Sequence, residues 1–135
     1  MDAEFRFDVE IPVRYRDLDT LSHVNNAVYA TYLEHARIAY VDRVLGEGFE
    51  AGGMVLANIE IDFRRPITFD DDAVRVECGV VNVGDSSFRM GYRVFGAGDV
   101  AATAESVQVA WDGEASRPIP DDWRDAVETY EPSLD

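Results

Sequence analysis

Six polar side chains that could act on an acyl group lie within ten residues of one another: Asp17, Asp19, Ser22, His23, Asn25 and Asn26. A carboxylate in such a cluster could attack a carbonyl carbon or activate a water molecule as a general base. If a helix begins at Asn25 or Asn26, its first backbone N–H groups are unpaired and could stabilise the oxyanion that forms on the carbonyl. The spacing therefore favours acyl chemistry that uses one carboxylate and one backbone donor.

The segments on either side of this cluster have the periodicities of a strand and of a helix. Apolar and polar residues alternate over residues 4–15, which predicts a half-buried strand. Pro12 cannot donate a ladder hydrogen bond, so we expect this strand at a sheet edge or a bulge. Over residues 25–45 the apolar positions recur at helical spacing, which predicts one long helix capped by Asn25 or Asn26. The polar cluster therefore lies at a strand-to-helix junction.

Four further strand patterns follow the predicted helix. They cover residues 55–63, 74–80, 88–94 and 100–111. A sheet with one apolar face can bury one helix by wrapping around it, so this order predicts an α+β fold with about five antiparallel strands around a central helix. A short C-terminal helix is expected at residues 121–129. Because no repeat or linker interrupts the 135 residues, we expect residues 1–135 to form a single domain.

The charge balance of the chain is strongly acidic. It holds 27 acidic residues against 12 basic ones, all of them arginine, for a net charge of -15. Such a surface repels itself in dilute buffer, whereas at about 1 M salt the screening length falls to roughly 3 Å. We therefore expect a host with a salt-rich cytoplasm; an acidic protein of an ordinary cell is the alternative. The same charge argues against a nucleic-acid partner, which needs basic patches.

Neither a membrane span nor a signal peptide is expected. No apolar run reaches the length of a bilayer span, and Met1-Asp2-Ala3-Glu4 lacks a basic start with an apolar stretch behind it. The single cysteine, Cys78, cannot form an internal disulfide, which fits a reducing cytoplasm. Its place among alternating apolar residues predicts a buried side chain.

The polar cluster and the helix behind it resemble the 4-hydroxybenzoyl-CoA thioesterase family of hotdog-fold proteins. The resemblance rests on Asp17-Leu18-Asp19-Thr20-Leu21-Ser22-His23-Val24-Asn25-Asn26-Ala27-Val28-Tyr29 and on Tyr32-Leu33-Glu34-His35-Ala36-Arg37. Later in the chain, Asp62-Phe63-Arg64-Arg65-Pro66 and Asp70-Asp71-Asp72 resemble the family's second strand and the turn after it. The segment is close to the broad acyl-CoA thioesterases and is also similar to the plant acyl-ACP thioesterases.

The resemblance implies a hotdog fold and hydrolysis of acyl-CoA thioesters, with no cofactor and no metal ion. Members pair as homodimers, often as homotetramers, with active sites at the subunit interface. The family's catalytic Asp corresponds to Asp19, as nucleophile or general base, and its oxyanion donor corresponds to the backbone amide of Asn26. His23 corresponds to the assisting His of the plant enzymes, although Leu21 stands where those enzymes have Asn.

Further residues are predicted to contact the substrate. Asn25, Tyr29 and Tyr32 would lie beside the acyl group, near the start of the helix. Arg64 and Arg65 are candidates for binding the CoA phosphates, because an arginine pair makes a local positive spot in an acidic chain. Ion pairing of these two arginines with nearby aspartates is the alternative.

Other polar residues of the resembling segment are given structural interpretations. We interpret Asp17 as a structural carboxylate, Glu34 as an exposed ion-pair partner of Arg37, and His35 as a surface residue. One Asp/His cluster without further His or Cys is a poor set of transition-metal ligands, so no zinc site is expected.

Other functions stay open at this point. A hotdog dehydratase or hydratase would show an Asp-x-Asn-Pro motif, which Thr20-Leu21-Ser22 does not supply. A non-catalytic acyl-CoA-binding module would bind the thioester without releasing a thiol. A structural dimer subunit with a dead site would neither bind nor turn over a thioester.

Overall fold

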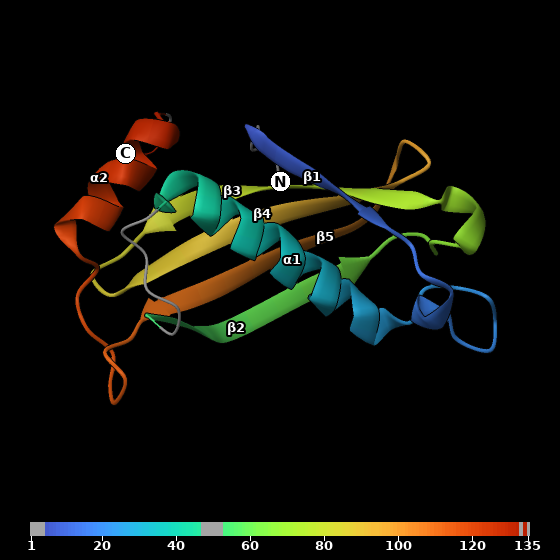
Figure 1. Cartoon of the computed structure of the whole chain (residues 1–135), viewed down its shortest axis with the longest axis horizontal. Helices are drawn as coiled ribbons and strands as arrows, with labels where there is room; N and C mark the ends of the chain where they lie inside the picture. The colour runs from blue at the N-terminus through green and yellow to red at the C-terminus, as the bar shows by residue number, and fades with distance from the viewer. Residues whose placement is uncertain (1–4, 47–52, 133, 135) are drawn as a thin grey trace.

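A five-stranded antiparallel sheet and one long helix make up most of the structure (Figure 1). The computed structural model describes residues 5–46, 53–132 and 134. In chain order the main elements are β1 (Phe7–Pro12), α1 (Asn26–Val44), β2 (Met54–Phe63), β3 (Ala73–Val83), β4 (Ser87–Gly96), β5 (Asp99–Ala110) and α2 (Asp121–Tyr130). Two single-turn 3-10 helices lie before α1 and before β3, namely η1 (Tyr15–Asp17) and η3 (Phe69–Asp71). The predicted α+β fold, one helix wrapped by an antiparallel sheet, is confirmed.

The strands lie in the order β1-β3-β4-β5-β2, and each neighbouring pair is antiparallel. β1 and β2 are therefore the two edges of the sheet. Pro12 pairs with Ala73 at the end of β1, which confirms the predicted edge position, where a missing N–H costs little. β2 pairs with β5 along one side, and no described residue pairs with its other side. This open edge of β2 leaves backbone groups that a further strand could pair with.

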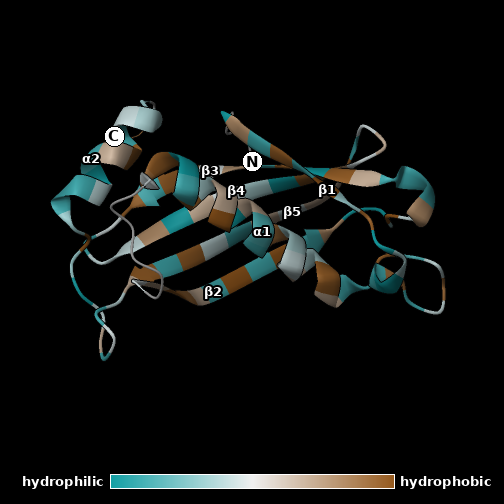
Figure 2. Ribbon diagram, in the orientation of Figure 1, coloured by the Kyte–Doolittle hydropathy of each residue, from teal (hydrophilic) through white to brown (hydrophobic). Residues whose placement is uncertain are grey.

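The core lies between α1 and one face of the sheet. The buried stripe of α1 follows the helical spacing seen in the sequence: Tyr29, Tyr32, Leu33, Ala36 and Tyr40. The strands contribute alternate residues, and Figure 2 shows this alternation of apolar and polar positions along them. Full burial of one such large apolar side chain contributes about 1.5–3 kcal/mol. Cys78 is buried in β3, as predicted, and burial raises the pKa of its thiol to about 12.

Two strand predictions needed correction. The alternation over residues 4–15 predicts a strand that continues to Tyr15, but β1 ends at Pro12 and Tyr15 begins η1 with 80% of its side chain exposed. The strand stops there because Asp17 bonds back to Arg14 and closes a tight turn. In β2 a register shift between Leu56 and Asn58 breaks the predicted alternation, and most of its residues are exposed. Glu4, at the start of the first predicted strand, lies outside the described residues.

The C-terminal helix α2 covers one end of the sheet and forms where the sequence predicts a helix over residues 121–129. Trp123 and Val127 on one face of α2 are buried. Just after α2, the buried Glu131 accepts a hydrogen bond from the Tyr40 hydroxyl at 2.8 Å. Burial raises the pKa of the Glu131 carboxyl above its ordinary value, although the bond from Tyr40 acts to lower it.

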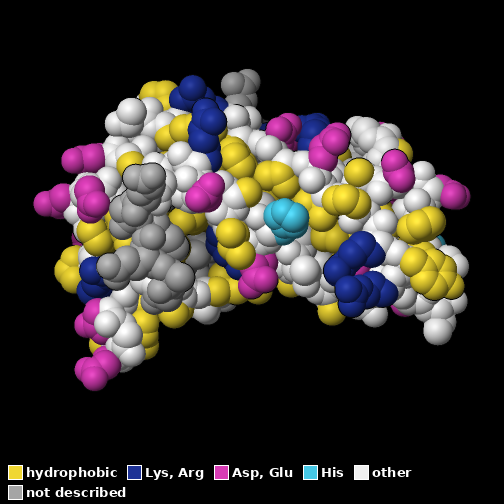
Figure 3. Space-filling view, in the orientation of Figure 1, with side chains coloured by type: hydrophobic (Ala, Val, Ile, Leu, Met, Phe, Trp, Pro, Cys, Tyr) yellow, Lys and Arg dark blue, Asp and Glu magenta, His cyan; other side chains and the backbone are white. Residues whose placement is uncertain are grey.

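Acidic side chains are distributed over the molecule and do not form one cluster. Figure 3 shows them at both ends and along the upper edge of the face that α1 crosses. Some are paired with arginine, as where Arg75 lies 3.2 Å from Asp8 and 2.8 Å from Glu77. Among the residues placed in the structure, no helix has the length and apolar character needed to cross a membrane.

Candidate functional site

Asp17 anchors the segment that joins η1 to α1. Its carboxylate, 1% exposed, accepts the Arg14 backbone N–H at 2.9 Å, two guanidinium N–H groups of Arg14 at 3.0 and 3.1 Å, and the Tyr32 hydroxyl at 2.9 Å. Its backbone carbonyl accepts the N–H of Asn25 at 2.9 Å. Burial acts to raise the pKa of Asp17, but the hydrogen bonds from Arg14 and Tyr32 outweigh it and hold the pKa below its ordinary value. Asp17 therefore has the contacts of a structural carboxylate.

Asp19 orders the loop that follows. Its Oδ1 accepts the backbone N–H of Leu21 at 2.9 Å and that of His23 at 3.3 Å. Its own N–H donates to the His23 carbonyl at 2.8 Å, and the left-handed backbone of Ser22 (φ 64°) lets the chain turn between them. No hydrogen bond from a described residue reaches Oδ2, and the side chain is half-buried. One oxygen thus holds the loop, and the other is left for a substrate or a water molecule.

His23 is joined to Asp19 through its backbone, not its ring. Its N–H and carbonyl both bond to Asp19, and its backbone forms a bridge with Thr68. Within the described part of the chain, the imidazole ring makes no hydrogen bond, and the ring is half-buried. The structure therefore places His23 beside the loop carboxylate without an Asp–His ring contact.

The start of α1 presents a backbone donor. Asn25 is the N-cap, and its side-chain oxygen accepts the N–H of Ala27 at 2.9 Å. Asn26 is the first helical residue, so its N–H has no acceptor within the helix, and the cap oxygen is used by Ala27. The first turn contains no acidic residue that would offset the positive end of the helix dipole. Asn26 is exposed, so a carbonyl oxygen could reach this N–H.

The two arginines predicted to bind the CoA phosphates differ in their contacts: the Arg65 guanidinium is hydrogen-bonded to described residues, and that of Arg64 is not. The Arg65 guanidinium donates to the carbonyls of Pro66, at 3.1 Å, and of Gly96, and it lies 3.8 Å from Asp71. These bonds hold Arg65 in the turn after β2. Its approach to Asp71 is the ion pairing that was the alternative to phosphate binding for this pair. Arg64 is exposed, and its guanidinium makes no hydrogen bond or ion pair with a described residue. Of this pair, Arg64 alone has a guanidinium without a partner among the described residues.

Tyr29 and Tyr32 lie beneath the helix start and are each 2% exposed. The Tyr32 hydroxyl is used by Asp17. The Tyr29 and Phe63 rings pack edge to face, with their centroids 4.9 Å apart. Burial raises the pKa of the Tyr29 hydroxyl. Neither tyrosine is open to solvent, whereas Phe63, at the end of β2, has 47% of its side chain exposed. Phe63 is a candidate site residue that the sequence alone did not single out.

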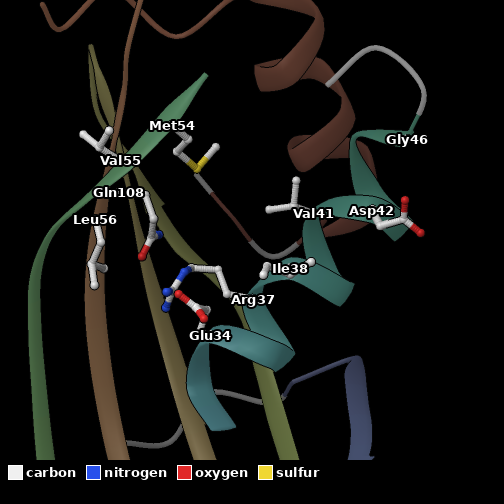
Figure 4. Close-up of a pocket in the computed structure, with 10 residues that line it drawn as sticks. All are labelled: Glu34, Arg37, Ile38, Val41, Asp42, Gly46, Met54, Val55, Leu56 and Gln108. Carbon is white, nitrogen blue, oxygen red and sulfur yellow. The ribbon is translucent and has the colours of Figure 1, made fainter. Parts of the chain in front are cut away.

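A groove of about 490 Å³ lies between α1 and the first residues of β2 (Figure 4). Its wall is apolar along Ile38, Val41 and Met54, and its inner end holds Arg37 and Gln108. The predicted ion pair of Glu34 with Arg37 is wrong, because the Arg37 guanidinium turns inward and donates to the Tyr92 hydroxyl at 3.3 Å. One usable signal for this groove was present in the sequence, since Gln108 is a polar residue at an inward position of a strand. No group of three or more His, Cys, Asp or Glu side chains able to hold a metal ion occurs among the described residues.

The chain is similar to known thioesterases over nearly all of its length. Residues 13–127 match the model of the thioesterase-like superfamily. A thioesterase from Thermus thermophilus, solved as a complex with coenzyme A and Zn, is 40% identical, with a TM-score of 0.88 over 95% of this chain and 96% of that chain. The Bacillus subtilis (strain 168) protein named "Putative acyl-CoA thioesterase YneP" is 27% identical over 88% of this chain and 93% of its own length.

A more distant structure supports the fold alone. The DHNA-CoA thioesterase from Staphylococcus aureus is 21% identical, with a TM-score of 0.78 over 93% of this chain and 90% of that chain. The five-stranded sheet around α1 is thus shared well beyond the range of close sequence similarity. The chain has the hotdog fold and belongs to the thioesterase-like superfamily.

Proposed function

We propose that the protein hydrolyses acyl-CoA thioesters to the free acid and CoA. The observation that carries this proposal is an available carboxylate oxygen in the loop that leads to an available backbone donor. No described residue donates a hydrogen bond to Oδ2 of Asp19, and the same loop ends at the Asn26 N–H, which has no acceptor within the helix. Membership of the thioesterase-like superfamily supports the reaction, and the 40% identical relative with coenzyme A supports the class of substrate.

In the proposed reaction the thioester carbonyl oxygen accepts a hydrogen bond from the Asn26 N–H. The Asp19 carboxylate then attacks the carbonyl carbon, or removes a proton from a water molecule that attacks it. Either route places negative charge on the carbonyl oxygen, and the C–S bond breaks when that charge returns, releasing the CoA thiolate, which takes up a proton. Attack by water gives the free acid directly. Attack by Asp19 leaves an acyl–Asp19 anhydride, which a water molecule must then hydrolyse to release the acid and restore the carboxylate. One oxyanion donor contributes about 3 kcal/mol in known enzymes, and a general base contributes about 10²–10⁴-fold in rate.

The other predicted site residues take supporting roles in this proposal. Asn25 caps the helix and so fixes the direction of the Asn26 N–H. Because Tyr29 and Tyr32 are buried, they position the helix start and do not line an open pocket. His23 positions the Asp19 loop through its backbone, and the exposed Arg64 would contact a CoA phosphate.

We also propose that two copies of the chain pair through β2. The open edge of β2 carries exposed apolar side chains at Val55, Leu56 and Phe63, and Ile38 on α1 is 63% exposed. An unpaired strand edge with exposed apolar residues favours pairing with another chain. If β2 pairs with β2 of a second copy through a two-fold axis, the two strands are antiparallel. The start of β2 in one copy then lies beside the end of β2 in the other. Light scattering at high KCl should give the mass of a dimer or a tetramer.

We also propose a domain organisation and a cellular compartment for the protein. We expect residues 1–135 to form one domain, since a single sheet and one long helix hold the core of the described residues. A buried, unpaired Cys78 thiol and a net charge of -15 support a cytoplasm that is reducing and salt-rich.

A thiol-release assay over a panel of acyl-CoAs at multimolar KCl tests the proposed function. Hydrolysis should release one free thiol for each acid formed. Tight binding without thiol release would indicate an acyl-CoA-binding module instead, and neither binding nor release would indicate a structural subunit. Hydration of an enoyl-CoA without thiol release would indicate a hydratase.

A further inference from the structure

A chain of polar side chains runs from the inner end of the groove into the core. The Arg37 guanidinium donates to the Tyr92 hydroxyl at 3.3 Å, and this hydroxyl lies 2.6 Å from the Ser106 hydroxyl. Ser106 bonds in turn to the Gln108 side chain, whose amide nitrogen donates to the Phe88 carbonyl at 3.4 Å. Tyr92, Ser106 and Gln108 are all buried. These contacts hold Arg37 in a fixed inward position.

Arg37 has no carboxylate partner among the described residues. Within that part of the chain the ion pairs are formed by other arginines, and none includes Arg37. Glu34 lies one helical turn earlier and lines the same groove without forming an ion pair with Arg37. In Figure 4 the Arg37 side chain extends from α1 toward Gln108 on β5. A half-buried cation whose partner is a neutral hydroxyl favours an anion brought by a ligand.

The shape and lining of the groove suit a small amphiphilic group. Its volume of about 490 Å³ lies within the usual range for small-molecule sites, which are mostly apolar with a few polar groups. Ile38, Met54 and Leu56 provide apolar surface, and Arg37 and Gln108 provide the polar inner end. The carboxylates of Glu34 and Asp42, both exposed, also line the groove, so a substrate carboxylate would meet Arg37, the one cationic residue among the described residues that line it, at the inner end. An aliphatic chain that ends in a carboxylate matches both parts.

The groove and the Asp19 loop lie at opposite ends of β2. Met54 and Leu56, at the start of β2, line the groove, whereas Phe63 at its end packs on Tyr29 beneath the start of α1. In a symmetric antiparallel pairing of β2 with a second copy, the start of one strand lies beside the end of the other. The groove of one copy would then adjoin the Asp19 loop of the second copy.

We propose that this groove receives the acyl group of a thioester held at Asp19 of a second copy, and that Arg37 selects acyl groups that end in a carboxylate. This inference rests on the proposed function and names its substrate class: CoA monoesters of dicarboxylic acids. Arg37 would act as a specificity-determining residue that contacts the end of the substrate farthest from the reacting carbon. Tyr92 would act as the positioning residue of Arg37.

Pairs of acyl-CoAs with equal chain length, ending in a methyl group or in a carboxylate, test this selection. For the wild type, kcat/KM should be at least about tenfold higher for the carboxylate member at the best chain length, as one charge-assisted hydrogen bond allows. Arg37→Met should abolish this preference, so that the ratio of kcat/KM between the two members of each pair falls to about one, and Arg37→Lys should retain part of it. Arg43→Met removes the same charge from the exposed last turn of α1 and should leave the preference unchanged.

Failure of this inference and failure of the proposed function give different results. If the wild type releases no thiol from any thioester, the proposed function is overturned. The role of Arg37 would then be tested by the ratio of the dissociation constants within each acyl-CoA pair instead of the ratio of kcat/KM. A ratio that is the same in the wild type and in Arg37→Met would overturn the role of Arg37. A monomeric mass at working concentration would overturn the shared site, because the groove and Asp19 would then stay apart.

Discussion

Replacing Asn26 with proline removes the backbone N–H on which the proposed oxyanion site depends. The substitution suits the structure because Asn26 is the first residue of α1, a position at which proline is common. Asn25 has φ -62° and ψ 138°, the extended conformation that a residue before proline prefers. The cap oxygen of Asn25 bonds to Ala27, so no hydrogen bond within the helix is lost.

The expected effect on catalysis is therefore much larger than the effect on stability. Loss of one oxyanion donor lowers kcat by about 10²–10³-fold in known enzymes, or about 3–4 kcal/mol. The free energy of unfolding should stay within about 1 kcal/mol of the wild type, because a compatible proline also restricts the unfolded chain. Thiol release under saturating acyl-CoA gives kcat, and urea unfolding in the same KCl buffer gives stability.

Asn26→Ala is the matched control. It removes the exposed side chain but keeps the N–H, so its kcat should stay close to that of the wild type. Wild-type kcat in a folded Asn26→Pro variant would refute the role of this N–H. Equal losses in the two variants would instead assign the effect to the Asn26 side chain.

Three further predictions concern stability. Asp17→Asn should lower the free energy of unfolding by about 3 kcal/mol or more in urea titrations, because an NH₂ group in place of either carboxylate oxygen loses two hydrogen bonds to a charged acceptor. These are the two from the Arg14 guanidinium at Oδ1, or those from the Arg14 N–H and the Tyr32 hydroxyl at Oδ2. A change below about 1 kcal/mol would contradict its anchoring role. Because the pKa of Glu131 is raised in the folded state, its contribution to stability is fully present below the unfolded pKa and is lost as pH rises through the folded pKa. Glu131→Gln should therefore flatten the fall in melting temperature above about pH 4.5, and an unchanged slope would contradict this. The melting temperature should rise with KCl up to multimolar concentration, because screening relieves a net charge of -15, and a flat curve would contradict the expected salt-rich host.

The candidate catalytic loop could be predicted because its determinants are local. Asp19, Asn25 and Asn26 lie within eight residues, and the side chains of Asp19 and Asn25 accept backbone N–H groups of near neighbours in the chain. Helical spacing and a capping residue place the start of α1 to within one residue. The family resemblance of this segment then assigned roles that periodicity alone does not provide.

What could not be predicted depends on residues that are distant in the chain. Arg37 turns inward because Tyr92 lies 55 residues later on a strand that the helix crosses, and a long arginine side chain can face either way on a helix. Arg65 is engaged by the Gly96 carbonyl, 31 residues away, which no local pattern indicates. The groove has walls from α1, β2 and β5, so it exists only after the sheet has formed.

The kcat/KM of Asp19→Asn for acyl-CoA hydrolysis tests the catalytic role of this carboxylate most directly. The amide oxygen of asparagine can still accept the N–H groups of Leu21 and His23, so the loop should keep its form while the second carboxylate oxygen is replaced by an NH₂ group. We predict a fall of at least about 10²-fold in kcat/KM, with the free energy of unfolding within about 1 kcal/mol of the wild type. A folded Asp19→Asn variant that hydrolyses acyl-CoA as fast as the wild type would contradict the proposed mechanism.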